Sequence, residues 1–133
     1  MRFIPTRIHG FLDYAVGVLL IVAPWLFGFA AGGAETWVAV ILGLGAIAYS
    51  LFTDYELGVV RTIPMTTHLG LDAGSGVILA ASPWIFGFAD LVYLPHLILG
   101  LFEIAAALTT HTVAYVETRA VEESRAPIGR PRL

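Results

Sequence analysis

The chain has 133 residues, of which 58% are hydrophobic and 13% are charged. A water-soluble domain of this length could not bury so much apolar side chain, because its high surface-to-volume ratio leaves too many residues facing solvent. A lipid bilayer is therefore the expected solvent for most of the chain. The formal net charge of -3 makes nucleic acid an unexpected partner, and the lack of cysteine excludes disulfides and thiolate metal sites.

Four apolar segments predict four membrane-spanning helices. Crossing about 30 Å of hydrocarbon takes about 20 apolar residues in a helix. The segments that meet this requirement, or nearly do, are residues 11–29, 37–52, 69–88 and 94–116. The connections after the first and third segments are short, which predicts two antiparallel hairpins. We therefore expect an all-α fold, a bundle of four transmembrane helices.

The arginines predict how these helices are oriented. All seven basic residues are arginines, and they lie before the first segment, between the second and third, and after the fourth. The positive-inside rule then places both termini in the cytoplasm of a multi-pass membrane protein. The first apolar run resembles a signal peptide, but it contains Asp13 and recurs later in the chain, so we expect it to be retained. Residues 117–133 combine charges with proline and glycine, which predicts a frayed helix end followed by a disordered cytoplasmic tail.

The first and third segments follow one pattern. Residues 9–29 and 68–88 are identical at 11 of 21 positions without a gap, and the second and fourth segments match more weakly. This predicts two tandem two-helix hairpin repeats, residues 1–60 and 61–116. Because each repeat contains two spans, both copies run in the same direction, and we expect a pseudo-twofold axis along the membrane normal.

Each copy carries a proline-tryptophan block near the outer end of its first helix, Ala23-Pro24-Trp25 and Ser82-Pro83-Trp84. With the duplication, these blocks resemble the SPW-repeat family of small bacterial and archaeal membrane proteins, over about Arg7 to His111. The resemblance implies an integral protein of the bacterial or archaeal inner membrane built from two-helix repeats. It implies no activity, catalytic residue or cofactor. The first block departs from the family motif, since it has alanine in place of serine.

The repeated identities concentrate on one stripe of each odd-numbered segment. At about 100° per residue, His9, Gly17, Leu20 and Pro24 all lie within about 40° of Asp13. Lipid-facing positions accept any apolar residue, so this stripe predicts the face on which the two copies meet. We expect close helix approach at the glycines, kinks or helix ends at the prolines, and interfacial anchoring at the tryptophans. The predicted structural residues are Gly17, Pro24, Trp25, Gly70, Gly74, Gly76, Pro83 and Trp84.

Five ionisable residues are candidates for a polar site inside the membrane. His9 and Asp13, like His68 and Asp72, are four residues apart and can share a hydrogen bond on one helix face. The simplest interpretation is an aspartate stabilised near a helix N-terminus; the alternative is that the two pairs meet to bind a metal or haem, or to relay protons. Glu103 lies deep in the fourth segment, which predicts an interhelical hydrogen bond or a proton pathway.

The sequence contains no P-loop, dinucleotide fingerprint, HExxH motif or serine elbow, so an enzyme is not expected. We expect a non-catalytic accessory or assembly module in the lipid bilayer, as a homo-oligomer or a subunit of a larger complex, with no cofactor. One alternative is a haem- or metal-binding redox protein that uses His9 and His68. The other is a proton or ion conductor through Asp13, Asp72 and Glu103.

Overall fold

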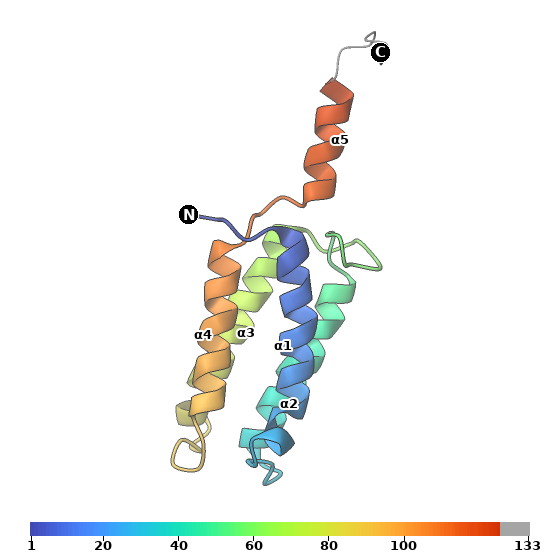
Figure 1. Ribbon diagram of the computed structural model, residues 1–133. Coiled ribbons are helices and arrows are strands. Elements are labelled where there is room, and N and C mark those ends of the chain that lie inside the picture. The colour runs from blue at the N-terminus through green and yellow to red at the C-terminus, as the bar shows by residue number, and fades with distance from the viewer. Residues whose placement is uncertain (126–133) are drawn as a thin grey trace.

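A computed structural model of the protein describes residues 1–125, which contain helices and no strand (Figure 1). The helices are α1 (Thr6–Leu26), α2 (Ala34–Leu51), α3 (Met65–Ile85), α4 (Leu94–Thr109) and α5 (Tyr115–Arg125). The first four lie side by side as a bundle, and α5 extends from the end of the bundle where the chain begins (Figure 1). The all-α prediction is confirmed.

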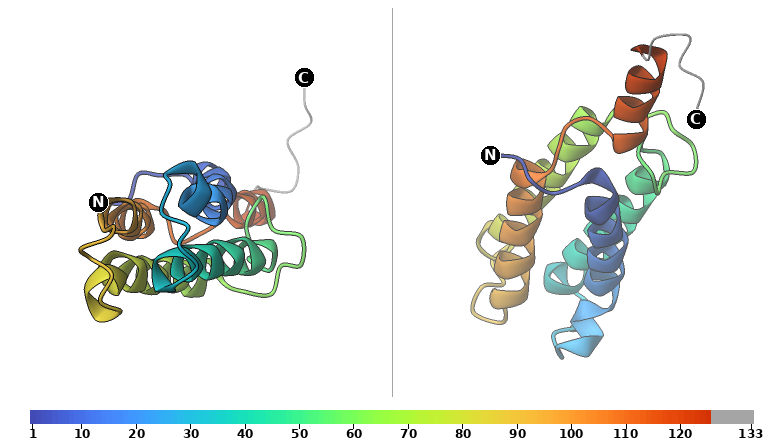
Figure 2. Two further views of the ribbon diagram at one scale, coloured as in Figure 1. Left: turned by 90° about the horizontal axis from the view of Figure 1, so that it is seen from below. Right: turned by 45° about the horizontal axis from the view of Figure 1, so that its top comes forward.

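The bundle consists of two hairpins, α1 with α2 and α3 with α4, whose turns lie at the same end (Figure 1). Viewed along the bundle, α1 and α4 form one layer and α2 and α3 form the other (Figure 2). Packing is closest within each hairpin, and between the hairpins α2 packs on α3 more extensively than α1 packs on α4. The side of the bundle formed by α1 and α4 is therefore the more open of the two.

The apolar character of the helices points to a membrane protein. Both α1 and α2 are long and apolar enough to cross a bilayer, and α4 is apolar but has only 16 residues. Helix α3 has 21 residues but is less hydrophobic than α1 and α2. It carries several polar residues, and His68, Asp72 and Ser82 among them are buried inside the bundle. Large apolar side chains such as Phe11 and Ile41 are exposed on the outside, where lipid would contact them.

Helix α4 ends earlier than predicted, at Thr109 instead of residue 116. The backbone N–H groups of Phe3 and Ile4 both donate to the Thr109 carbonyl, and the N–H of His111 donates to the Ile4 carbonyl. These bonds form a short parallel bridge between Ile4 and Thr110, which has an extended backbone. The first residues of the chain thus satisfy backbone groups at the end of α4 that would otherwise lack a partner.

The helix end predicted at the start of residues 117–133 continues as far as Arg125, since residues 117–125 belong to α5. This segment is rich in glutamate and arginine, which have high helix propensity. Arg119 and Glu123 form an exposed i,i+4 ion pair at 3.7 Å. Residues 126–133 lie outside the described part of the chain.

The proline-tryptophan blocks lie in the last turns of α1 and α3. Because proline has no N–H, Pro24 and Pro83 leave the carbonyls of Leu20 and Leu79 without their helical partner. The hydroxyl of Ser82 donates to the Leu79 carbonyl at 2.7 Å. Alanine occupies the equivalent position 23 and offers no such bond. The serine therefore compensates for the hydrogen bond that the proline removes.

A glycine ends each of these helices. Gly28 and Gly87 have φ angles of 74° and 73°, in the left-handed region that glycine adopts without steric cost. The N–H of Phe29 then donates to the Pro24 carbonyl at 2.8 Å, five residues back, in the Schellman pattern. The equivalent bond joins Phe88 to Pro83 at 2.8 Å. Both phenylalanines are buried, so the cap also turns an aromatic ring into the bundle.

We expect Ser82→Ala to lower the free energy of unfolding by about 1 kcal/mol, because it leaves a buried carbonyl without a donor. The reverse change in the first block, Ala23→Ser, is expected to raise stability, since Ala23 is buried beside the equivalent carbonyl. Thermal unfolding in detergent micelles measures both. Equal unfolding temperatures for Ser82→Ala and the parent would contradict this account of the serine.

Four glycines permit close contact within the hairpins. A Cβ atom added at Gly43 would lie 2.6 Å from the Gly17 carbonyl oxygen, and one added at Gly76 would lie 2.7 Å from that of Gly100. The predicted close approach at Gly17 and Gly76 is thus observed, in each case within one hairpin. Gly70 and Gly74 are different: both are exposed, and no atom of the described chain lies within 4 Å of an added Cβ. The prediction that they pack helices together is wrong within a single chain, because their face of α3 points outward.

The two kinds of glycine on α3 should therefore respond differently to alanine. Gly76→Ala forces α3 and α4 apart and is expected to cost about 1–3 kcal/mol of stability. Gly74→Ala meets no atoms and is expected to leave stability unchanged or to raise it by up to about 1 kcal/mol. Thermal unfolding of the two variants in the same detergent tests this. A large loss for Gly74→Ala would show that its exposed face packs against another chain.

Candidate metal centre

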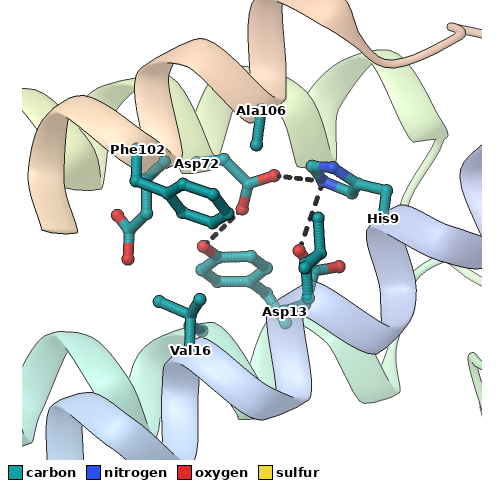
Figure 3. A pocket seen from close by; sticks show the side chains of 10 residues that line it. His9, Asp13, Val16, Asp72, Phe102 and Ala106 are labelled. Atoms are coloured by element: carbon teal, nitrogen blue, oxygen red, sulfur yellow. Dashed lines mark hydrogen bonds and ion pairs between the residues drawn. The ribbon is translucent and has the colours of Figure 1, made fainter. Parts of the chain in front are cut away.

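Four ionisable side chains, two from α1 and two from α3, meet inside the bundle. His9 and Asp13 lie one turn apart on α1, and His68 and Asp72 lie one turn apart on α3. One ligand atom from each residue lies within 4.8 Å of all the others, and we call this group the His-Asp quartet. Figure 3 shows His9 directed at both Asp13 and Asp72.

The contacts within the quartet cross between the hairpins. The Nε2 atom of His9 lies 2.8 Å from a carboxylate oxygen of Asp72 and 3.2 Å from one of Asp13. The Nε2 atom of His68 lies 3.1 Å from Asp13 and 3.2 Å from Asp72. Each histidine thus contacts the aspartate of its own helix and that of the other helix, so the quartet joins the two hairpins.

The quartet is removed from solvent. The exposed fractions of His9 and His68 are 1% and 0%, and those of the two aspartate side chains are 8% and 7%. Burying two carboxylates costs several kcal/mol each unless nearby positive charge compensates. The quartet therefore requires two positive charges, supplied either by protons on the histidines or by a bound cation.

Two threonines contact the Nδ1 atoms of the histidine rings. The Oγ1 atom of Thr110 lies 2.8 Å from His9 Nδ1, and the Thr110 hydroxyl donates to the Ala106 carbonyl at 2.7 Å. Thr53 does the same for His68, at 2.8 Å from Nδ1, and donates to the Tyr49 carbonyl at 2.7 Å. Because each hydroxyl proton is already committed to a carbonyl, each Oγ1 accepts a hydrogen bond from Nδ1–H.

This arrangement directs both Nε2 atoms toward the carboxylates. A histidine that donates through one nitrogen to a fixed oxygen acceptor and presents the other nitrogen to a shared centre has the geometry of a metal ligand. Within the described residues, His68 Nε2 is buried and has no hydrogen-bond partner of acceptable geometry, although two carboxylates lie near it. A cation between these groups would bind the lone pair of His68 Nε2, which no hydrogen bond of good geometry occupies.

Two tyrosines donate to the carboxylates. The Tyr49 hydroxyl donates to Asp72 Oδ1 at 2.6 Å, and the Tyr55 hydroxyl donates to Asp13 Oδ2 at 3.0 Å. Tyr55 belongs to the connection between α2 and α3, which folds back so that its ring is buried beneath the end of the bundle. Burial, reinforced by the negative charge of Asp13, raises the pKa of Tyr55 far above its usual value, so its hydroxyl remains a donor.

The remaining predicted residues lie outside the quartet. Glu103 is buried on α4, and its Oε2 accepts a hydrogen bond from the Ser75 hydroxyl at 3.0 Å. Trp25 and Trp84 are more than half exposed at the opposite end of α1 and α3, and the Trp84 ring lies 5.9 Å from that of Tyr93. The tryptophans therefore take no part in this site.

Sequence reasoning missed the residues that surround the quartet, namely Tyr49, Thr53, Tyr55, Ser75 and Thr110. A signal was present for two of them. Thr53 and Thr110 are 57 residues apart, the same separation as Gly43 and Gly100 in the matching second helices. Extending that weak alignment past the helix ends would have paired the threonines. Tyr49 has no such partner, because the corresponding position 106 is alanine.

The donor set suits a metal ion better than a haem. The rings of His9 and His68 are only 5.4 Å apart between centroids, in an edge-on arrangement, and both aspartates occupy the space that their Nε2 atoms face. This leaves no room for a porphyrin. Two imidazole nitrogens and two carboxylate oxygens match the ligands of divalent first-row transition metals.

The profile of the SPW repeat domain matches residues 7–110. The match covers most of the chain, including α1 to α4 and the whole quartet, and the chain belongs to the SPW repeat family. The resemblance inferred from the two proline-tryptophan blocks is confirmed. No curated protein and no solved structure matches the chain.

The two threonines provide a test of the quartet as a symmetric unit. Thr110→Val and Thr53→Val each leave a buried Nδ1–H without an acceptor, and each is expected to cost about 1–3 kcal/mol in the free energy of unfolding. Thr109→Val is the matched control, because its hydroxyl bonds only to carbonyls of its own helix, Ala105 and Ala106. Thermal unfolding of the three variants compares them, and a loss for Thr109→Val equal to the others would contradict this assignment.

Proposed function

We propose that this membrane protein binds one divalent first-row transition-metal ion through His9, Asp13, His68 and Asp72. The observation that carries the proposal is the convergence of four buried ligand atoms, two from each hairpin, within 4.8 Å. This develops the metal-binding alternative of the sequence analysis, with both aspartates added to the predicted ligands His9 and His68.

Charge balance supports a divalent ion. With neutral histidines, the quartet carries two negative charges from Asp13 and Asp72, and a divalent cation makes the assembly neutral. A neutral assembly costs far less to bury than a charged one. Neutrality matters most in a protein surrounded by lipid, where solvent cannot compensate the charge.

The surrounding donors favour a metal over a simple ion-pair network. Each histidine is fixed by a threonine on its far nitrogen, and each carboxylate receives a tyrosine hydroxyl. Such outer partners orient ligands and are a general feature of protein metal sites. An ion-pair network alone would not require His68 Nε2 to lie beside two carboxylates without a hydrogen bond of good geometry to either.

In this proposal the metal lies between two tandem repeats that together cross the membrane four times. Both hairpin turns lie at the same end of the bundle (Figure 1). This supports two repeats that run in the same direction, with a pseudo-twofold axis along the membrane normal. The arginine distribution supports cytoplasmic termini, which would place the quartet near the cytoplasmic face of a bacterial or archaeal inner membrane. Attachment to a larger complex and homo-oligomer formation stay predictions.

The test is the metal content of the purified chain in detergent, measured by mass spectrometry of the elements after dialysis against Zn²⁺, Mn²⁺, Fe²⁺ or Co²⁺. We expect one ion per chain for at least one of these metals, and a metal-dependent rise in unfolding temperature. At a free concentration of 100 times Kd the stabilisation is about 2.7 kcal/mol. His9→Ala and Asp72→Asn are expected to lose both the bound ion and the stabilisation.

His111→Ala is the matched control, because His111 is exposed just beyond the end of α4 and lies outside the quartet. It should bind metal as the parent does, which excludes adventitious binding to surface histidines. Circular dichroism shows whether each variant remains folded. A folded parent chain that holds none of the four metals and gains no stability from them would refute the proposal and leave the quartet as an ion-pair network.

A further inference from the structure

The two hairpins are equivalent at the quartet but differ around it. Positions in α2 and α4 that are 57 residues apart correspond, yet Tyr49 corresponds to Ala106 and Ala46 corresponds to Glu103. The tyrosine closes the side of the quartet next to Asp72, because its hydroxyl bonds to that carboxylate at 2.6 Å. At the equivalent position beside Asp13, an alanine side chain cannot do this.

A cavity of about 20 Å³ borders the quartet and is lined by both Tyr49 and Ala106. Roughly 10–15 Å³ is enough to hold one water molecule. Its polar lining is His9, Asp13, Asp72, Tyr49 and Glu103, and Ala106 forms part of its wall. Figure 3 shows Ala106 next to His9, with Asp72 and Phe102 on the same side. The cavity thus reaches the quartet directly.

Glu103 gives the cavity a second polar wall. Its carboxyl group is buried, and one of its oxygens is held by the Ser75 hydroxyl at 3.0 Å. The Ser75 hydroxyl also lies 3.1 Å from the backbone carbonyl of Asp72, so it connects Glu103 with the helix that carries two of the quartet residues. The remaining walls are apolar and come from Leu12, Val16, Ala46 and Phe102.

We infer that this cavity is an open coordination position, where one exchangeable water binds the quartet metal and hydrogen-bonds to Glu103. The inference rests on the proposed metal binding. Structural metal sites are closed by protein ligands, whereas sites that act on a substrate keep one position for water. The missing tyrosine and the added glutamate both make α4 the open side, so the ligand class that this position accepts is water or another small oxygen donor.

The test uses the full chain in detergent, loaded with Co²⁺ or Mn²⁺, whichever binds stoichiometrically, and transferred into water enriched in oxygen-17. A directly coordinated water broadens the electron paramagnetic resonance signal of the metal. We expect broadening for the parent and its loss in Ala106→Val, whose two added methyl groups fill the cavity. Ala105→Val is the matched control, because Ala105 is exposed on the outer face of the same helix.

Glu103 is tested as the residue that positions the water. Glu103→Leu is expected to lose the broadening, and Glu103→Gln, which keeps a polar group at the same place, is expected to restore it. All variants should hold one metal ion per chain, since none of the changes touches a ligand.

The outcomes separate this inference from the proposed function. A parent chain that binds one metal but shows no oxygen-17 broadening overturns the open position and leaves metal binding intact. Unchanged broadening in Ala106→Val, with metal bound, places the water elsewhere and also overturns the inference. If the parent holds no stoichiometric metal, the proposed function fails first and the open position fails with it.

Discussion

The mutual neutralisation of buried charge at the centre of this bundle governs how its parts are arranged. Neither His-Asp pair could be buried against lipid or apolar side chains by itself, because each carboxylate would lack a full set of partners. Placing the two pairs face to face supplies each aspartate with two histidine nitrogens. The requirement directs the polar faces of α1 and α3 toward each other in the centre of the bundle, even though these helices belong to different hairpins.

The same requirement explains features at the ends of the helices. Helix α4 stops at Thr109, and the next residue, Thr110, turns its hydroxyl toward His9. The equivalent Thr53 follows the end of α2 and reaches His68. Each half of the chain therefore supports the histidine of the other half, which links the two hairpins more firmly than the limited packing between α1 and α4 would.

The two hairpins contribute equally to the quartet but differ in the residues around it. The shared residues build the quartet and the capped helix ends, and they account for stability. Tyr49, Glu103 and the cavity beside Ala106 break the equivalence on one side of the quartet only. Both carboxylates receive a tyrosine hydroxyl, but Tyr49 reaches Asp72 from α2, whereas Tyr55 reaches Asp13 from the loop after α2. This asymmetry is the basis on which we infer a position for a small ligand beside the quartet.

The sequence alone determined the all-α fold, the membrane class and the residues at the centre. These features follow from hydrophobic content, the two matching segments and the spacing of the histidines and aspartates, which are matters of local periodicity and composition. The sequence left open whether the His-Asp pairs meet, since that depends on the relative rotation of α1 and α3. It overextended the fourth helix, whose end is set by hydrogen bonds to Phe3 and Ile4, more than 100 residues away. Tyr55 joins the site only because its loop folds back over the bundle, and Gly74 faces outward only because α3 packs on the Gly76 side. Contacts between distant segments decide such features, and no local pattern in the chain encodes them.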